Sequence, residues 1–592
     1  MILILGGTTE GRIAAETLES AAQPYYYSTH DEGQQVAMVH GTRLTGAMDS
    51  EALTECCTRH GIRLMVDAAH PFATMLHTNV VNAARQLHLP IVRYERRYSA
   101  RDDSAIWCRD YDEAMQKMEH DGVGRLLALT GVNTLAPLRP FWRRHECWWR
   151  ILRRPTSMAQ TQGVGFPTDH LIYYDDHTDT ATQILQLHPD AIITKESGES
   201  GGFMEKVEAA QRMGVRCYVV QRPSYPVDDK DEVTFVDGPY GLRRAVERLV
   251  PDFYHLHSGL TSGTCATAAA VAAARRLLTS ECSDEVPVVL PNGETIMVAV
   301  TYGDDYAAVV KDSGDDPDVT GGLEIRAAVS RATKFEIVGG KGVGVITLPG
   351  FDYPPGEAAI NRVPRQMIEA NLAPFSTPLR VVVSVEGGEE VARRTFNPRL
   401  GITGGISIIG VSGIVMPFSE EGFLQSIRKC MNVAVASGAE RVVINSGAKS
   451  ERFVKICYPD LPAQAFVEYG NYIGRTIEMA EEAGVQQLTL GVMMGKAVKL
   501  AAGELDTHSR RTTMNRQFVE QMVREAGCDT DISGITLARE LWTLLPAEDI
   551  PRFAHVVISH CMEHCAPLLP HGTLTILLID EDGGIYKLID NP

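Results

Sequence analysis

The stretch Ser258–Leu278, SGLTSGTCATAAAVAAARRLL, lies in the middle of the 592-residue chain but has the pattern of a domain's start. Hydroxyl and small residues lead into an alanine-rich run, which predicts a helix because alanine costs least in a helix interior. Thr261 or Thr264 can cap it, and its first N–H groups and dipole predict an anion site. A complete α/β pattern ends near Val250, so we interpret the chain as two proteins joined by the linker 251–257.

Composition excludes several classes of protein. A chain of this length is expected to hold about four domains. The formal net charge of −19 argues against nucleic-acid partners, which require a basic surface. The chain begins with an apolar strand pattern, so we expect no signal peptide, and no apolar run is long enough to predict a membrane span. The twelve cysteines form no disulfide framework by their spacing, so we expect a cytoplasmic protein.

The first half alternates strand and helix patterns, which predicts parallel sheets covered by helices on both faces. The strand Ile2–Leu5 is followed by the turn Gly6-Gly7-Thr8-Thr9-Glu10-Gly11-Arg12 and a helix. This order presents backbone N–H groups to a phosphate, although Thr8 stands where the Rossmann fingerprint has glycine. A tight turn with glycines used only for packing is the alternative. We expect two α/β domains, residues 1–122 and 123–250.

Three polar loops follow predicted strands of this half: Asp67–Phe72, Arg93–Tyr98 and Thr194–Gly202. Ligands of open α/β sheets bind at the carboxyl ends of strands, so the three loops are expected to converge on one crevice. His70 is the side chain in these loops whose ordinary pKa suits proton transfer near neutral pH. A structural hydrogen bond to a backbone carbonyl is the alternative role for His70.

The motifs ILILGGTTEGR, DAAHPFA, RYERRY, LTGVNTL and TKESGESGG resemble the precorrin-6A reductase family of cobalamin biosynthesis over about residues 1–250. The resemblance implies an enzyme that uses NADPH or NADH to reduce one double bond of a tetrapyrrole. The residues after the second strand include no obvious ribose-binding acid, which favours NADPH. The candidate residues for cofactor binding are Gly6, Gly7, Thr8, Thr9, Glu10, Gly11, Arg12 and Ser28. The candidates for substrate binding are Ser197 and Gly198, and those for catalysis are His70 and Lys195.

The second half predicts an α+β domain, residues 258–415, with one of its strands at Val391–Phe396, and a Rossmann-like α/β domain, residues 416–592. The acidic run within Lys311–Thr320 indicates either a cation site or carboxylates that cap turns. Two histidines and two cysteines within His560–Cys565 face different sides of a helix, so we expect no metal site.

Several arginines of the second half stand in acidic surroundings. Arginine binds carboxylates in a bidentate manner, so these side chains are candidates to hold a polycarboxylate substrate, with surface ion pairs as the alternative. The candidates are Arg362, Arg365 and Arg399.

The motifs TSGTCATAAA, KDSGDDPDVTGG, GKGVGVITLPG, TFNPRLGITGGISIIGVSGIV and GNYIG resemble the cobalt-precorrin-5B C1-methyltransferase family. The resemblance implies S-adenosylmethionine as methyl donor, but no motif defines the donor's contacts. An electron-rich ring carbon can attack the sulfonium methyl directly, so positioning supplies most of the catalysis and Cys265 is not needed as a nucleophile. His508, Asp315 and Asp316 are the candidate acid–base residues.

The sequence therefore predicts a bifunctional enzyme of cobalamin biosynthesis. Its second half would methylate C1 of cobalt-precorrin-5B, and its first half would reduce (cobalt-)precorrin-6A to the 6B form. The alternative is an active methyltransferase with a degenerate reductase domain that only binds tetrapyrrole or scaffolds other enzymes of the pathway. Such enzymes are the macromolecular partners that this alternative implies.

Overall fold

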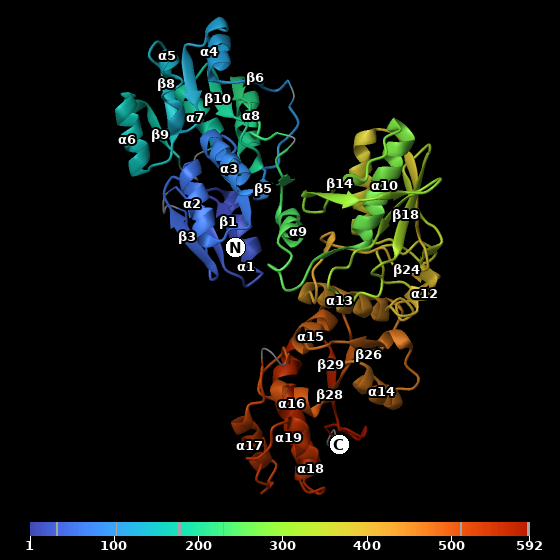
Figure 1. The fold of residues 1–592 in the computed structure, drawn as a ribbon. Coiled ribbons are helices and arrows are strands. Elements are labelled where there is room, and N and C mark those ends of the chain that lie inside the picture. The colour runs from blue at the N-terminus through green and yellow to red at the C-terminus, as the bar shows by residue number, and fades with distance from the viewer. Residues whose placement is uncertain (31–33, 102, 175–178, 229, 509–511, 589–592) are drawn as a thin grey trace. The chain divides into compact units, whose positions relative to one another are not determined.

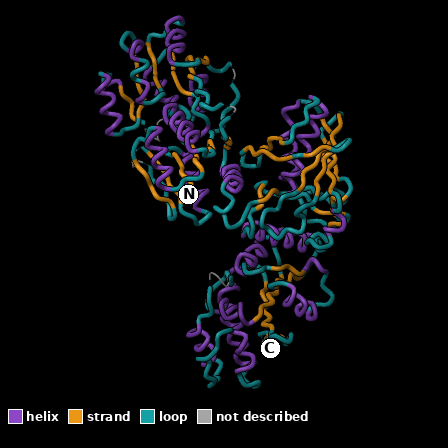
Figure 2. The backbone as a smooth tube through the Cα atoms, viewed as in Figure 1, coloured by secondary structure: helices purple, strands orange, loops and turns teal. Residues whose placement is uncertain are grey.

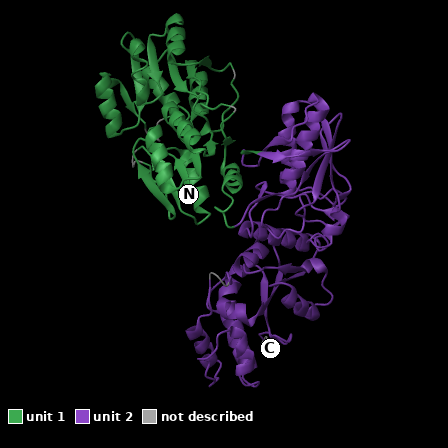
Figure 3. Ribbon diagram, viewed as in Figure 1, with its two compact units in different colours: residues 1–255, 294–296 green, residues 256–293, 297–592 purple. Residues whose placement is uncertain are grey.

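The computed structural model describes residues 1–30, 34–101, 103–174, 179–228, 230–508 and 512–588. It divides into two compact units, residues 1–255 with 294–296 and residues 256–293 with 297–592 (Figure 3). Both units contain strands and helices throughout (Figure 2). In the part of the chain that is described, no helix is long and apolar enough to cross a bilayer.

The first unit contains two six-stranded parallel sheets (Figure 1). The strands of the first sheet are β1 (Ile2–Leu5), β2 (Tyr25–Thr29), β3 (Gly41–Thr45), β4 (Leu64–Asp67), β5 (Ile91–Tyr94) and β12 (Val233–Val236), in the order β12-β5-β4-β1-β2-β3. Helices α1 (Thr9–Glu19) and α9 (Pro239–Leu249) pack on one face, and α2 (Ser50–His60) and α3 (Thr74–Leu87) on the other. Every residue of β1 is buried, as expected for a parallel strand covered on both faces.

The second sheet has the order β6-β11-β10-β7-β8-β9 and is also covered on both faces. Its strands are β6 (Ile106–Cys108), β7 (Arg125–Ala128), β8 (Glu146–Ile151), β9 (Leu171–Tyr173), β10 (Ala191–Lys195) and β11 (Arg216–Val220). Its helices are α4 (Tyr111–His120), α5 (Arg139–Trp142), α6 (Pro155–Val164), α7 (Thr180–Leu187) and α8 (Phe203–Arg212).

The chain crosses from the first sheet to the second between β5 and β6 and returns between β11 and β12. Strand β6 pairs with β11 in the second sheet, whereas β12 pairs with β5 in the first. The expected boundary after residue 122 does not coincide with this crossing. The physical reason is that an edge strand joins whichever sheet offers it unpaired N–H and C=O groups, whatever its place in the sequence.

The second unit begins with an α+β arrangement. Its main sheet has the order β16-β17-β18-β22-β19. Helix α10 packs on this sheet, and α11 packs against α10. The bounds are α10 (Ser262–Thr279), β16 (Thr301–Tyr302), β17 (Ala307–Val310), β18 (Glu324–Arg331), β19 (Glu336–Gly339), α11 (Arg362–Leu372) and β22 (Leu379–Val385). Short strands complete this region: β13 (Gly259–Leu260), β14 (Glu285–Val289), β15 (Thr295–Ala299), β20 (Gly342–Val343), β21 (Val345–Ile346), β23 (Ile402–Thr403), β24 (Gly405–Ile406) and β25 (Ile414–Val415).

The last part of the second unit has a sheet in the order β27-β26-β28-β29-β30, parallel except for β30. Its strands are β26 (Arg441–Asn445), β27 (Phe466–Glu468), β28 (Gln487–Met493), β29 (Thr573–Ile579) and β30 (Ile585–Tyr586). Its helices are α13 (Glu420–Ala436), α14 (Ala448–Cys457), α15 (Ile473–Glu482), α16 (Met494–Ala501), α17 (Arg516–Glu525), α18 (Leu541–Leu544) and α19 (Ile550–Cys565). The predicted multidomain α/β and α+β fold is confirmed.

One predicted strand is wrong. The sequence predicts a strand at Val391–Phe396, but Val391 and Ala392 end helix α12 (Gly388–Ala392) and a turn follows. Glu389 and Glu390 lie in the first turn of that helix, where the dipole favours acidic residues. Burial of the two apolar residues is therefore achieved by a helical turn and not by strand alternation.

The expected anion site at the start of α10 is also wrong, although Thr261 caps this helix as predicted and accepts from the Thr264 N–H at 3.2 Å. The Gly263 N–H already donates to the Ile409 carbonyl at 2.9 Å. A Cβ at Gly263 would lie only 2.8 Å from Pro364 Cγ. The chain itself occupies the place where an anion would have to approach.

Candidate functional site

The turn between β1 and α1 brings glycine backbone and helix start into close contact. Thr8 caps α1 by accepting from the Gly11 N–H at 3.1 Å, and its hydroxyl donates to the Ala68 carbonyl at 2.7 Å. A Cβ at Gly11 would lie 2.7 Å from Gly6 Cα, so only glycine fits there. Gly7 has φ +93°, a conformation that glycine adopts without strain.

The same turn leaves backbone donors for a phosphate. The Gly6 N–H donates to the Ser28 carbonyl at 2.9 Å, and the Gly7 N–H to Gln34 Oε1 at 3.1 Å. Among the described residues, no group accepts a hydrogen bond from the N–H groups of Thr8, Thr9 or Glu10. Free N–H groups at a helix start are the usual phosphate ligands, so the turn fits a nucleotide.

Two arginines, Arg43 on β3 and Arg12 on α1, act on Tyr27 of β2. The Arg43 guanidinium lies 5.8 Å from the centre of the Tyr27 ring. Burial raises the pKa of Tyr27, while the Gly7 N–H and the charges of Arg43 and Arg12 act against that rise. Ser28 itself is buried and supports the turn through its carbonyl. The next residues, 31–33, lie outside the described part of the chain.

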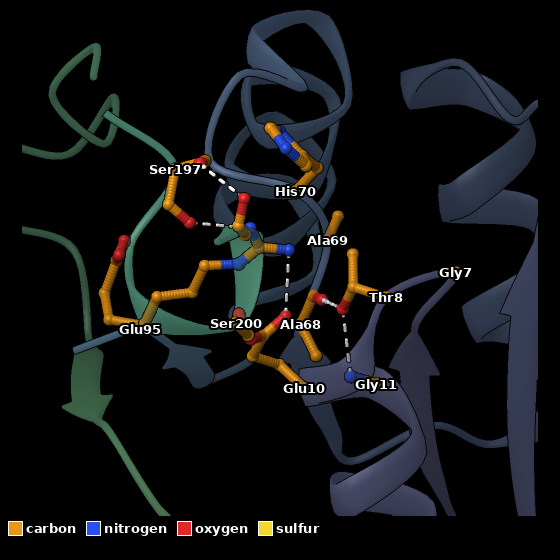
Figure 4. A network of polar contacts seen from close by, with 12 residues as sticks. Gly7, Thr8, Glu10, Gly11, Ala68, Ala69, His70, Glu95, Ser197 and Ser200 are labelled. Carbon is orange, nitrogen blue, oxygen red and sulfur yellow. Dashed lines mark hydrogen bonds and ion pairs between the residues drawn. The ribbon is translucent and has the colours of Figure 1, made fainter. Parts of the chain in front are cut away.

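A buried ion pair joins the turn between β1 and α1 to the loop after β5, which in turn contacts the loop after β10 (Figure 4). Glu10 Oε2 lies 3.1 Å from Arg96 Nη2, and both side chains are more than nine-tenths buried. Arg96 also donates to the Ser197 carbonyl at 2.7 Å, and the Ser200 hydroxyl donates to Glu10. Glu10, which we expected to bind the cofactor, therefore holds three loops together in this structure.

A second buried cluster fixes the loop that carries His70. Asp67 Oδ2 accepts from His77 Nδ1 at 2.7 Å and from the Tyr225 hydroxyl at 2.8 Å, and Arg93 Nη1 lies 3.0 Å from Asp67 Oδ1. Burial alone would raise the pKa of Asp67, but the His77 hydrogen bond and the Arg93 charge lower it to about 2. His77 Nε2 also bonds the His70 carbonyl at 3.0 Å, so the cluster positions the backbone of His70.

Residues from the predicted loops line one cavity of about 220 Å³. His70, Lys195 and Ser197 line it, whereas Gly198 does not. A Cβ at Gly198 would lie 2.8 Å from Arg96 Cβ, so this position faces Arg96. The other lining residues are Leu129, Thr130, Gly131, Arg150, Ile151, Leu152, Tyr174, Thr194, Gly201 and Lys206. Three cations and no carboxylate belong to this lining, so the cavity suits an anionic group.

Sequence reasoning missed Arg150 and Lys206, and it named Thr194 only as the start of a loop. Arg150 lies inside the apolar strand β8. An arginine in an apolar strand is a signal that the sequence shows, because a buried cation needs hydrogen-bond or charge partners. Arg150 donates to Thr180 Oγ1 and Gln183 Oε1, each at 3.2 Å. Thr194 is fully buried, and its hydroxyl has no hydrogen-bond partner among the described residues.

Burial in the cavity changes the ionisation of its lining. Burial lowers the pKa of Lys195 to about 8 and, with the charge of Arg150, that of Lys206 to about 8. Burial and the charges of Arg96 and Lys195 lower the pKa of His70 to about 3. His70 is therefore neutral near pH 7, and its Nδ1 accepts from the Phe72 N–H at 3.2 Å. The lysines, and not His70, have the pKa suited to proton donation near neutral pH.

In the second unit the acidic run acts mainly in turns. Asp315 Oδ2 accepts from the His257 N–H at 2.7 Å, and Asp316 Oδ2 from the Phe418 N–H at 3.2 Å. Asp318 binds the buried Lys311 ammonium at 2.8 Å. Within the described ranges, no group of three or more histidine, cysteine, aspartate or glutamate side chains is arranged to hold a metal ion.

The three candidate arginines have different surroundings. Arg365 Nε donates to the Ile360 carbonyl at 3.0 Å, and its guanidinium lies 4.3 Å from the centre of the Tyr353 ring. Arg399 donates to the buried Glu451 at 2.9 Å. Arg362 is exposed at the first position of α11. Arg365 is thus engaged by its own loop, whereas Arg362 is open to a ligand.

His508 follows α16 in the last domain, and its N–H donates to Asp506 Oδ1 at 3.1 Å. Nearby, burial lowers the pKa of Lys496 to about 8, and this ammonium donates to the Gly470 carbonyl. Among the described contacts, none joins His508 to Asp315 or Asp316, so these contacts do not gather the three candidate acid–base residues into one cluster.

Comparison with known families assigns both halves. The model described as precorrin-6x reductase CbiJ/CobK matches residues 1–237. The model for CbiD matches residues 251–417, and that for the CbiD C-terminal domain matches residues 506–587. The chain is 41% identical over 350 residues to a protein of Prosthecochloris aestuarii named cobalt-precorrin-5B C(1)-methyltransferase, covering 56% of this chain and 95% of that protein.

Two solved structures are also similar. One is a cobalamin biosynthesis protein (cbiD) from Archaeoglobus fulgidus, with 29% identity, 46% of this chain and 85% of that chain covered, and a TM-score of 0.26. The other is named CobK precorrin-6A reductase, with 20% identity, coverages of 42% and 97%, and a TM-score of 0.35.

The two halves therefore define a fusion of two enzyme classes, a reductase followed by a methyltransferase. The chain belongs to the cobalt-precorrin-5B C(1)-methyltransferase family through its second half, and its first half matches the precorrin-6x reductase family model over residues 1–237. The predicted fusion is confirmed.

Proposed function

We propose that the chain carries out both activities: S-adenosylmethionine-dependent methylation of C1 of cobalt-precorrin-5B, and NADPH-dependent reduction of (cobalt-)precorrin-6A to the 6B form. The cationic cavity of the first unit carries the reductase part of this proposal. Arg150, Lys195 and Lys206 line it without a carboxylate, and a precorrin presents acetate and propionate groups that such cations bind. Similarity over 95% of a named relative carries the methyltransferase part.

For the reduction, bound NADPH supplies a hydride to one carbon of the double bond, and a proton must reach its other end. The free N–H groups of Thr8, Thr9 and Glu10 are assigned to the dinucleotide's phosphates. Lys195 is assigned to proton donation, since burial brings its pKa to about 8. Neutral His70 orients the macrocycle through its ring, with its backbone held by His77.

For the methylation, the C1 carbon donates an electron pair to the methyl group of the donor, the carbon–sulfur bond breaks, and S-adenosylhomocysteine leaves. No protein nucleophile is required, so the second unit acts by holding both reactants in line. We assign Arg362 and Arg399 to the carboxylates of the macrocycle. Asp315 and Asp316 hold turns through His257 and Phe418, so we rank them below His508 as acid–base residues.

The decisive experiment supplies the purified full chain with cobalt-precorrin-5B, S-adenosylmethionine and NADPH under anaerobic conditions. We expect methylated product first and then stoichiometric loss of NADPH absorbance. Methylation without NADPH oxidation, also when cobalt-precorrin-6A is supplied directly, would support the alternative of a degenerate, tetrapyrrole-binding reductase domain. Neither reaction would contradict the proposal altogether.

A further inference from the structure

The last sheet of the second unit has the strand order at which α/β proteins bind nucleosides. After β26, the chain forms β27 on one side of it and β28 on the other. Both neighbours are parallel to β26, so their carboxyl ends lie at the same edge of the sheet. Ligands of open α/β sheets bind at such a reversal of strand order, outside these carboxyl ends.

Glu468 ends β27 at this edge, opposite Asn445, which ends β26. The turn that follows β26 contains Gly447 with φ +131°, and a Cβ there would lie 3.0 Å from Glu468 Oε1. The carboxylate therefore lies directly beside the turn that starts α14. An acidic side chain at the end of the second strand, about 20 residues after the first turn, is the group that binds ribose hydroxyls in dinucleotide folds.

The Glu468 carboxylate is half-buried and has no hydrogen bond among the described residues. Burial raises its pKa, while the charges of Arg399 and Lys496 act against that rise. A partly desolvated carboxylate without a donor is costly unless a ligand supplies hydroxyl or N–H groups. Helix α14 likewise begins without a side-chain cap.

A small pocket adjoins this carboxylate, lined by Phe396, Arg399, Leu400, Cys430, Val433, Gln464, Phe466 and Glu468. Its volume of about 10 Å³ holds a hydroxyl group and not a ring, so the rest of a ligand must lie along the strand ends. Arg399, which we assign to the substrate's carboxylates, lines the same pocket. Methyl transfer requires donor and acceptor side by side, and this juxtaposition meets that requirement.

The chemistry of the edge selects among nucleosides. Gly447 donates its N–H to Asn445 Oδ1 at 3.0 Å, and the Ser446 N–H donates to Ser450 Oγ at 2.9 Å, so these two donors of the turn are already used. A phosphate would also meet the Glu468 carboxylate. A nucleoside with a positively charged sulfonium avoids this repulsion and is attracted to the carboxylate.

We propose that Glu468 accepts hydrogen bonds from the ribose hydroxyls of S-adenosylmethionine at the carboxyl ends of β26 and β27. This site rests on the proposed function, because it needs the methyltransferase to use that donor. The adenosine lies along the strand ends, and its ribose diol faces Glu468. The reacting methyl group then lies on the side of Arg399.

The test is isothermal titration of the full chain with S-adenosylhomocysteine and with its 2′-deoxy analogue. We expect the unaltered chain to bind the deoxy analogue about tenfold or more weakly, because a hydrogen bond to a charged group is lost. Glu468→Gln should bind S-adenosylhomocysteine about tenfold or more weakly and should discriminate less between the two ligands. The control Glu478→Gln, on the exposed side of α15 in an ion pair with Arg475, should leave both affinities unchanged.

The outcomes separate the two proposals. If the unaltered chain binds neither ligand, the donor assigned in the proposed function is wrong, and the site with it. If it binds both ligands equally, or if Glu468→Gln keeps the full discrimination, the ribose site alone is wrong. The comparison of ligands on the unaltered chain decides the matter even if the variant does not fold. Tighter binding of ATP than of S-adenosylhomocysteine would also overturn the site.

Discussion

Glu10 on the first turn of α1 and Arg96 in the loop after β5 form a buried ion pair, with 3.1 Å between Oε2 and Nη2. Arg96 also donates to the Ser197 carbonyl at 2.7 Å. One guanidinium therefore connects the turn between β1 and α1 with the loop after β10, which lines the cavity. The pair connects the turn proposed to bind the cofactor with the loop that lines the proposed substrate cavity. Its removal should therefore affect both stability and reduction.

Arg96→Met should destabilise the first unit by about 3–5 kcal/mol, because Glu10 is left as an unpaired buried charge. Urea unfolding followed by tryptophan fluorescence measures this, since four of the five tryptophans lie within residues 1–255. The control Arg59→Met, whose partner Glu55 is exposed, should change the free energy of unfolding by less than about 0.5 kcal/mol. Equal effects of the two substitutions would contradict a special role for the pair.

Reductase activity should fall as the pH rises through about 8. Burial lowers the pKa of Lys195 to about 8, so the ammonium is present below that pH and is lost above it. The measurement is kcat/KM for NADPH oxidation between pH 6 and 10. Lys195→Arg keeps the positive charge but cannot give up a proton, so most of the activity should be lost and the remainder should not decline near pH 8. If Lys206→Arg removes the decline instead, Lys206 is the proton donor.

Arg43→Ala should raise the KM for NADPH about tenfold and leave that for NADH nearly unchanged. A hydrogen bond to a charged group is worth about 1.5–3 kcal/mol. Arg43 on β3 lies beside Tyr27 of the neighbouring strand β2, and in related folds an arginine near the second strand binds a 2′-phosphate. Steady-state kinetics with both nucleotides test this, with NADH as the internal control. A preference of the unaltered chain for NADH would refute the choice of NADPH.

Arg362→Ala and Arg399→Ala should each weaken the binding of cobalt-precorrin-5B about tenfold, since a charged hydrogen bond to a carboxylate is lost. Arg365→Ala should chiefly lower thermal stability, because its guanidinium holds the Ile360 carbonyl and packs on Tyr353. Absorbance titration of the tetrapyrrole and a thermal unfolding scan distinguish these effects. Unchanged affinity in both of the first two variants would rule out their role as carboxylate ligands.

Gly11→Asp should abolish reduction and leave methylation intact. A Cβ at Gly11 would lie 2.7 Å from Gly6 Cα, and the new carboxylate would repel the phosphates of the nucleotide. NADPH binding followed by fluorescence is the measurement. The control Gly163→Asp stands in open space at the end of α6 and should bind NADPH normally. Normal nucleotide affinity in a folded Gly11→Asp chain would move the phosphate site away from this turn.

The sequence alone predicted what depends on neighbours along the chain. The apolar run Ile2–Leu5, its glycine turn and the helix after it are set by local preferences, as is the cap of α10 by Thr261. The alternation of strands and helices likewise predicted parallel sheets. The start-like pattern at Ser258–Leu278, together with the two family resemblances, predicted a fusion of two enzymes. The sequence also placed His70 in a loop after a strand and Lys195 at the carboxyl end of one, where Lys195 is the last residue of β10, because polar residues that follow an apolar strand fall at its carboxyl end.

Only the tertiary structure decided what depends on residues distant in sequence. It placed β6 in the second sheet and β12 in the first, across the boundary expected after residue 122. It also brought Arg150 and Lys206 to Lys195 in one cavity. It gave Glu10 a structural partner and closed the start of α10 with the Ile409 carbonyl. The physical reason is that packing and burial act between segments far apart along the chain. A sequence shows which groups carry charge or polarity, but their partners and pKa values depend on what the fold places beside them.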